Sequence, residues 1–366
     1  MSGIVADNVD RVSGVVAAAA AGPTISASDP TITTNATLGT QWANSSSGEF
    51  FILTDSSEDA NVWTNVGGGS GDIEPWTMQG TVSGYAAAGY SGGGINVIQK
   101  FSLTSDANAT DVGDTTETKW YLAGTSSETH GYCATGKASG STKSNVIEKF
   151  SFASDGNASD VSDPTVARTA PCGQNTSSHG YASGGSSASG NETTIDKWAT
   201  ASDANATDVG DLTTARYLLA GQSSSTHGYS TSGIPSNVDI IDKYTFASDA
   251  NATDVGDRTV GGAYLTGQSS SSHGYTSANY TSSPTNVIDK FSFSSDGNAT
   301  DVGDLTVARY GVFGQSSTTH GYTSGGWNSS NALTNIIDKF AFASDGNATD
   351  VGDLINTVGG SSGQQY

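Results

Sequence analysis

Residues 337–353 read IDKFAFASDGNATDVGD, and close variants of this stretch occur six times along the chain. Its last ten residues, SDGNATDVGD, are called the acidic decamer here. The six decamers begin at Ser105, Ser154, Ser202, Ser248, Ser295 and Ser344, at intervals of 49, 48, 46, 47 and 49 residues. A repeat of nearly constant length indicates a structural unit that contains one loop of variable length. The sequence therefore predicts an array of six equivalent units.

The composition indicates an all-β protein. Only 34% of the 366 residues are hydrophobic, and they occur in short alternating runs bounded by Gly and Ser, which is typical of many short strands. The net charge is −22, and half of the acidic residues lie in the decamers. A surface this acidic disfavours a nucleic-acid partner. No apolar run is long enough to predict a membrane span. Cys133 and Cys172 occupy non-equivalent positions, so we expect free thiols.

One repeat, written from residue 305, contains four predicted strands. They cover residues 308–314, 320–324, 336–343 and 349–354. In the third of them, one face carries Ile337, Lys339 and Ala341, and the other carries Phe340 and Phe342. The sequence Asp-Gly-Asn at 345–347 predicts a tight turn between the third and fourth strands. Four antiparallel strands in about 48 residues are the unit of a β-propeller blade.

The repeat resembles the kelch type of blade. A double glycine ends the second strand, an aromatic third strand follows a loop of variable length, and an arginine follows the fourth strand. These features are Gly184-Gly185 and Gly325-Gly326, and Arg168, Arg216 and Arg309. The tryptophan usual in the fourth strand of a kelch blade is replaced by Val351 or its equivalents.

The number of blades follows from the second strand. Its HGY signature occurs five times, and Ser83-Gly84-Tyr85 supplies a sixth copy that has no first strand before it. Residues 355–362 align with a first strand, so we expect the C-terminal strand to complete the first blade. The prediction is a six-bladed propeller over residues 73–366, closed by its last strand, which leaves no free sheet edge. An intertwined β-fibre is the alternative architecture.

The first 72 residues differ in texture from the repeats. Residues 1–22 form an Ala-rich arm with a predicted short helix, and residues 23–72 form a small β module and linker. Strands are expected over 40–44, 49–54 and 61–66. Trp42, Phe51 and Trp63 are expected to share a small core.

This N-terminal region also resembles parts of phage virions. The stretches GTQWANSSSGEFFILTD (39–55) and ANVWTNVG (60–67) resemble a small β module of tail-fibre and other appendage proteins, and MSGIVADNVDRVSGVV (1–16) is similar to the N-termini of marine-phage structural proteins. The resemblance covers residues 1–66. It implies attachment to other virion proteins, a place on the surface of a particle assembled in the host cytoplasm, and no catalytic residue.

Several repeated residues could bind metal or hold blades together. His130, His179, His227, His273 and His320 are expected to be buried and hydrogen-bonded to a neighbouring loop, because residues repeated once per blade cannot converge on one metal ion. Asp345, Asn347 and Asp350 partly match a calcium loop, which makes Ca²⁺ a candidate cofactor, although an Asx turn explains the same spacing. Lys339 and its equivalents are expected to pair with Asp residues across the hairpin.

The loops between the second and third strands vary where the rest repeats. They are rich in Ser, Gly and Asn and carry aromatic anchors, a composition that suits adaptable recognition and stacking on sugars. Loop drift without any ligand is the alternative. The candidate ligand-binding residues in these loops are Tyr90, Lys137, Lys143, Asn191, Tyr280, Trp327 and Asn328.

No catalytic constellation stands out, because no His lies beside a Ser or Cys with an orienting group and the carboxylates repeat identically. The sequence therefore predicts a non-enzymatic virion protein, a tail fibre or similar appendage, whose propeller binds a host-surface glycan or protein. The alternatives are a capsid-decoration or head-fibre protein with a mainly structural role, and a glycan-cleaving tailspike. A homo-oligomer is expected.

Overall fold

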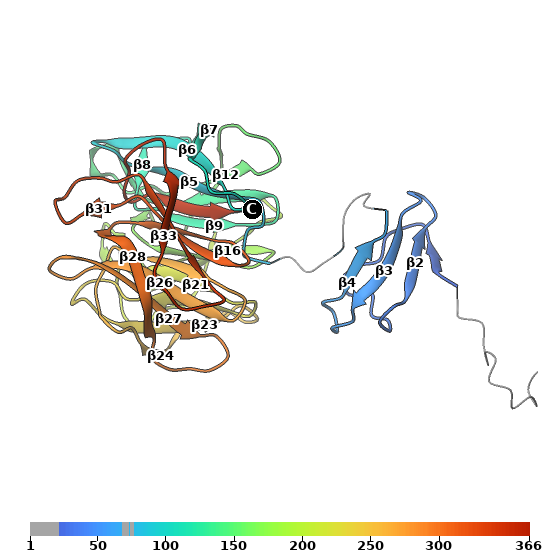
Figure 1. The fold of residues 1–366 in the computed structure, drawn as a ribbon. Helices are drawn as coiled ribbons and strands as arrows, with labels where there is room; N and C mark the ends of the chain where they lie inside the picture. The colour runs from blue at the N-terminus through green and yellow to red at the C-terminus, as the bar shows by residue number, and fades with distance from the viewer. Residues whose placement is uncertain (1–21, 68–72, 74–76) are drawn as a thin grey trace, which may run out of the picture. The chain divides into compact units, whose positions relative to one another are not determined.

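The computed structural model describes residues 22–67, 73 and 77–366, and many of its strands are labelled in Figure 1. The chain divides into two compact units, Met1–Trp76 and Thr77–Tyr366, which are described separately. Within the described residues the regular structure is β-strand, with one short 3₁₀ turn at Ser139–Ser141. The predicted all-β class is confirmed. The predicted Ala-rich helix of residues 12–21 lies outside the described residues.

The first unit contains one four-stranded sheet in the order β1-β2-β3-β4. Strand β1 pairs in parallel with β2, and the other pairs are antiparallel. The three predicted strands are found within two residues of their expected ends, whereas β1 was not predicted because three residues carry no alternation. The bounds are β1 (Thr24–Ser26), β2 (Gln41–Asn44), β3 (Phe50–Asp55) and β4 (Val62–Asn65).

A small core holds this sheet together. Phe51, Leu53 and Trp63 are fully buried, and Trp42 packs edge-on against Trp63 with ring centroids 5.9 Å apart. The tight turn between β2 and β3 depends on Gly48, whose φ of 80° is unfavourable for other residues. The predicted sharing of a core by Trp42, Phe51 and Trp63 is confirmed.

The second unit contains six main sheets, numbered here in chain order, and two small ones. Each main sheet has four main strands, named first to fourth. Sheet 1 is β34 (Ser362–Gln365), β5 (Ser83–Tyr90), β6 (Gly94–Ser102) and β7 (Thr110–Asp114). Sheet 2 is β9 (Ala123–Ser126), β10 (His130–Ala134), β12 (Ile147–Ser151) and β13 (Ser159–Ser162). Sheet 3 is β15 (Cys172–Asn175), β16 (His179–Ser183), β19 (Thr194–Ala199) and β20 (Thr207–Asp211).

The other three sheets repeat this pattern. Sheet 4 is β21 (Ala220–Ser223), β22 (His227–Thr231), β23 (Ile240–Thr245) and β24 (Thr253–Asp257). Sheet 5 is β25 (Thr266–Ser269), β26 (His273–Tyr280), β27 (Pro284–Ser292) and β28 (Thr300–Tyr310). Sheet 6 is β29 (Phe313–Ser316), β30 (His320–Ser324), β32 (Ile336–Ala341) and β33 (Thr349–Asp353).

Six two-residue strands lie outside this four-strand pattern. Most of them pair a segment that precedes a first strand with the loop that follows a second strand, whereas residues 190–191 pair with residues 186–187 inside one such loop. Their bounds are β8 (Lys119–Trp120), β11 (Lys137–Ala138), β14 (Arg168–Thr169), β17 (Ser186–Ser187), β18 (Gly190–Asn191) and β31 (Trp327–Asn328).

The prediction for one repeat is accurate for three strands and wrong for the first. Strand β29 covers Phe313–Ser316 rather than residues 308–314. Residues up to Tyr310 continue the fourth strand of sheet 5, and Gly311 then reverses the chain with a φ of 65°. The expected pairing of the C-terminal strand is observed: β34 runs antiparallel to β5, with Gly363 opposite Ala86, although β34 begins seven residues later than the alignment placed it.

A cycle of backbone hydrogen bonds joins the six sheets, and its six residues are called the axial ring. Each amide of the ring donates to the carbonyl of the ring residue one sheet earlier, with N–O distances from 2.5 to 3.1 Å, and the last bond runs from Tyr121 to Gly360. All six residues have φ between 55° and 65°, although four of them are not glycine. The six are Tyr121, Ala170, Leu218, Tyr264, Gly311 and Gly360.

The first strands of neighbouring sheets approach one another closely at a repeated glycine. A Cβ atom on Gly173 would lie 2.1 Å from the carbonyl oxygen of Gly124, and one on Gly363 would lie 1.9 Å from that of Gly314. Only glycine fits such a contact. The first strands of all six sheets are therefore packed around a narrow centre.

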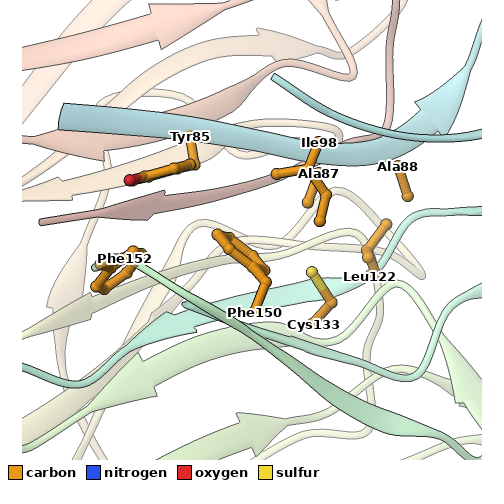
Figure 2. Packing of buried hydrophobic residues seen from close by; sticks show 8 residues of the cluster. All are labelled: Tyr85, Ala87, Ala88, Ile98, Leu122, Cys133, Phe150 and Phe152. Carbon is orange, nitrogen blue, oxygen red and sulfur yellow. The ribbon is translucent and has the colours of Figure 1, made fainter. Parts of the chain in front are cut away.

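The hydrophobic core lies between consecutive sheets. Figure 2 shows Tyr85 and Ile98 of sheet 1 above Phe150 and Cys133 of sheet 2. The Tyr85 ring stacks on Phe152, with centroids 5.0 Å apart. Side chains on one face of the third strand pack against the next sheet, and those on the other face pack against the previous sheet, as Ile337 and Phe340 do in sheet 6. Each sheet is therefore covered by a neighbour on both faces.

A buried ion pair lies inside five of the six sheets. In sheet 3 the Arg168 guanidinium is 3.0 Å from Asp196, which also accepts hydrogen bonds from the amide and hydroxyl of Thr165. The corresponding pairs are Lys119–Glu148, Arg216–Asp242, Arg258–Asp289 and Arg309–Asp338. Sheet 1 has Val358 and Gln99 at these two places, and Gln99 accepts the amide of Ile355 at 2.7 Å. The site therefore tolerates a neutral pair.

Candidate ligand-binding site

The acidic decamers join neighbouring sheets. The lysine of each third strand forms an ion pair with the first Asp of the decamer in the next sheet, as in Lys100–Asp155 at 3.0 Å. The prediction that these lysines pair across their own hairpin is wrong. Lys339 shares a strand face with Ile337, which packs toward sheet 1, so its ammonium meets Asp106. The other pairs are Lys149–Asp203, Lys197–Asp249, Lys243–Asp296 and Lys290–Asp345.

The three candidate calcium ligands are each engaged in another contact. Asp345 pairs with Lys290, the Asn347 oxygen accepts the amide of Asp304 at 3.1 Å, and the Asp350 carboxylate accepts the amide of Gly352 at 3.2 Å. The last contact is the expected Asx turn. In the part of the chain that the structure describes, no group of three or more His, Cys, Asp or Glu side chains is placed to hold a metal ion.

The histidines occupy a different environment from the expected one. Each is half-buried, and its Nδ1 lies within 2.9 Å of the hydroxyl of the preceding Ser or Thr, as in His320 and Thr319 at 2.8 Å. The expected hydrogen bond to a neighbouring blade is therefore wrong. Each histidine begins the second strand directly after a turn, so its nearest hydrogen-bond partner belongs to that same turn.

These histidines should make stability depend on pH. Burial, the largest cause, lowers the pKa of His130, His179, His227, His273 and His320 below 6.5. The unfolded chain then binds more protons than the folded chain below about pH 6.5, so stability is lost as pH falls from there through the folded pKa values.

We expect replacement of all five histidines by Ser, the residue at the equivalent Ser83, to reduce the loss of melting temperature between pH 7.5 and 5.0. Melting followed by circular dichroism at both pH values measures the difference, and the single variant His320→Ser should show a smaller effect of the same sign. Equal losses in the wild type and the five-fold variant would contradict the role given to these rings.

At the end of each sheet opposite the decamers, the backbone pairing is the same in all six sheets but the side chains differ. In every sheet, a residue just before the axial ring forms a β-bridge with a residue of the loop after the second strand. The six bridges join equivalent positions of the repeat, but the side chains at these positions differ. They are Gly359–Tyr90, Trp120–Lys137, Thr169–Ser186, Tyr217–Ile234, Ala263–Tyr280 and Tyr310–Trp327. We call them the variable bridges.

Seven half-buried aromatic side chains from the variable bridges and the axial ring form one connected group, the aromatic cluster. Tyr310 stacks on Trp327 with centroids 5.6 Å apart, and Tyr280 lies 4.8 Å from Tyr310. At the other side, Tyr90 lies 6.1 Å from Trp327 and 5.5 Å from Trp120. The members are Tyr90, Trp120, Tyr121, Tyr264, Tyr280, Tyr310 and Trp327.

A small hollow lies within the axial ring beside this cluster. Its volume is about 60 Å³, and Tyr121, Tyr264 and Leu218 are among its lining residues. Burial raises the pKa of the Tyr121 and Tyr264 hydroxyls, with neighbouring tyrosines adding to the effect, so both phenols stay neutral. Neutral rings with polar tips suit the faces and hydroxyls of a sugar.

The structure brings most of the predicted binding residues together. Tyr90, Tyr280 and Trp327 belong to the aromatic cluster, and the Lys137 ammonium lies 5.4 Å from the Trp120 ring centroid. Lys143 forms a bridge with Lys137, and Asn191 is opposite Ser186 in the short β17–β18 pair. Asn328 is the exception, because its side-chain oxygen accepts the amides of Ser330 and Ala332 within its own loop.

Sequence reasoning missed Trp120, Tyr121, Tyr264 and Tyr310. These residues precede the first strands, in segments of nearly constant length. The predicted binding residues come instead from the variable loops between the second and third strands. Their signal was the change of residue type at one repeat position: Trp120 corresponds to Thr169, Tyr217 and Tyr310 in other sheets.

Comparison with known proteins gives no family for the chain: no protein-family model matches it, and no curated protein is significantly similar. The described residues contain no helix with the length and apolar character needed to cross a membrane.

Proposed function

We propose that residues 77–366 form a six-bladed, kelch-like β-propeller closed by the C-terminal strand. Two observations support this architecture. The six four-stranded sheets repeat one strand order, and the hydrogen bonds of the axial ring run through all six sheets and return to the first. Each sheet is then one blade, and the two ends of the propeller carry the decamers and the variable bridges.

We further propose that this propeller is a non-enzymatic module that binds a host-surface glycan through the aromatic cluster. The observation that carries the proposal is the contrast between the two ends. At the decamer end the Lys–Asp contacts are the same in six copies, as the closure of a ring requires. At the other end, equivalent backbone positions carry different side chains, and aromatic ones gather on one side. Exposed aromatic faces stack on sugar rings.

The proposed setting is the surface of a phage virion. The sequence resemblance of residues 1–66 to virion appendage modules supports it, and we assign the first unit to attachment to other virion proteins. A tail fibre or similar appendage fits a glycan-binding propeller. Capsid decoration, or a glycan-cleaving tailspike, would use the same propeller differently, and both are outcomes of the experiments below.

We expect the labelled full chain to bind cells of the host and their isolated surface polysaccharide, and the variant Trp327→Ala to bind about ten-fold more weakly or worse, because large central aromatics dominate such sites. Lys149→Gln is the matched control: it removes an exposed ion pair at the decamer end and should leave binding unchanged. Equal affinities of the wild type and Trp327→Ala would overturn the assignment of the site.

Two further measurements separate the alternatives. Immunogold labelling of intact virions should place the protein on the tail; labelling of the head would favour decoration, and no labelling would contradict the virion setting. Incubation with host polysaccharide should release no reducing sugar; sustained release would replace the binding role with that of a tailspike enzyme.

A further inference from the structure

The aromatic cluster lies beside two lysines that form no ion pair with a carboxylate of the described residues. Among the described residues, every Lys and Arg other than Lys137 and Lys143 forms an ion pair with a carboxylate. This holds in a chain whose net charge is −22, where carboxylates are abundant. One loop of this acidic protein therefore holds two cations that have no carboxylate partner among the described residues.

Both lysines lie in the loop between β10 and β12, and the loop holds them side by side. Lys137 and Lys143 are partners in an antiparallel bridge. The Lys143 ammonium donates to the hydroxyl of Ser186 at 3.4 Å and to the carbonyl of Ser187, both in β17 beside sheet 3. The lysines thus occupy the edge of the cluster that faces sheet 3.

Lys137 is also connected directly to the aromatic cluster. Its ammonium lies over the Trp120 ring, and this cation–π contact holds the charge beside the surface on which a sugar would stack. Two carboxylates contact the loop. Glu117 accepts a hydrogen bond from Ser144 and lies 3.7 Å from the buried Lys119, and Asp163 accepts a hydrogen bond from Asn145 at 3.1 Å. Neither of these carboxylates forms an ion pair with Lys137 or Lys143, and Lys119 has its closer partner in Glu148 at 2.7 Å.

We propose that the glycan bound by this site is acidic, with a carboxylate or sulfate group that Lys137 and Lys143 receive while a neighbouring sugar ring stacks on the aromatic cluster. This inference rests on the glycan-binding role proposed above and specifies its ligand. An acidic surface elsewhere on the protein repels polyanions, so an anionic chain would be oriented toward the lysine edge.

The test compares three polysaccharides of similar length in biolayer interferometry with the full chain: polygalacturonate, dextran sulfate and neutral dextran. We expect one or both of the anionic chains to bind at least about ten-fold more tightly than dextran at low salt, with a loss of affinity as salt screens the contact. A preference between the two anionic chains identifies carboxylate or sulfate as the recognised group.

Variants of the loop connect the preference to the lysines. Lys137→Gln should weaken binding of the anionic chain by about ten-fold, the effect of one charged contact, and so reduce the preference over dextran. Lys137→Arg should retain most of the affinity, and Lys149→Gln at the decamer end should have no effect.

The two proposals fail in distinguishable ways. Equal binding of all three polysaccharides, or an anionic preference that Lys137→Gln does not reduce, overturns the acidic ligand and leaves glycan binding in place. If the wild-type chain binds none of the three polysaccharides and no host polysaccharide, both proposals are overturned.

Discussion

Truncation of the chain after Asp353 is expected to give a soluble protein with a much lower melting temperature. The deletion removes β34, opens the axial ring at Gly360, and takes the buried Leu354 and Val358 out of the core. Burial of two such side chains contributes about 5 kcal/mol. With roughly 2 °C lost per kcal/mol in a domain of this size, the melting temperature should fall by about 10 °C or more.

A single substitution in the same strand serves as the control. Gln364 donates from its Nε2 atom to the carbonyl of Tyr132 in sheet 2, and four other sheets have a glutamine in the same role. Sheet 2 has Thr125 at this place. Gln364→Thr should therefore lower the melting temperature by only about 3 °C, the loss of one net hydrogen bond. A truncated chain that melts at the wild-type temperature would contradict closure by the C-terminal strand.

Substitution of one partner of a buried ion pair is expected to have the largest effect of any single replacement. Arg168→Val should lower the free energy of unfolding by about 3–5 kcal/mol, because the Asp196 carboxylate is left buried without its cation. Burial already lowers the pKa of Arg168 and raises the pKa of Asp196, despite their mutual attraction. Burial of either charge is thus unfavourable by itself, and the attraction between Arg168 and Asp196 offsets this cost.

The double variant Arg168→Val with Asp196→Gln should recover most of that loss. It copies the Val358 and Gln99 of sheet 1, where the glutamine oxygen accepts the backbone amide that the carboxylate accepts elsewhere. Chemical denaturation of the wild type, both single variants and the double variant gives the coupling energy. Additive losses, with no recovery in the double variant, would show that the pair is not a replaceable unit.

The repeat made much of the fold predictable from the sequence. Alternation in the third strand and the constant HGY and decamer segments located three of four strands, because side-chain pattern and turn residues determine these locally. The first strand was misplaced, since the positive φ of Tyr121 and Leu218 comes from the hydrogen bonds of the axial ring and has no local signal. In sheet 5, Arg258 occupies the repeat position of Leu305 and still reaches its aspartate, an exchange no pattern would reveal.

The candidate site was predictable in part. Loop variability pointed to Tyr90, Tyr280 and Trp327, and the fold then placed them beside residues from other sheets. Partners between sheets could not be inferred: Lys339 lies six residues from Asp345 in sequence, yet pairs with Asp106, 233 residues away. Which of two equivalent aspartates a lysine meets depends on the face of the strand that packs against the next sheet.

Hydrogen–deuterium exchange of the full chain, with and without the polysaccharide that binds best, shows whether the ligand lies on the aromatic cluster. We expect new protection in segments 118–124, 135–146, 262–266 and 308–312 and in the loop from residue 327. These segments carry the lysine edge and all of the aromatic cluster except Tyr90 and Tyr280. The decamers, such as residues 344–353, should exchange as before. Protection confined to the decamers, with the aromatic cluster unchanged, would contradict the assignment of recognition to the variable bridges.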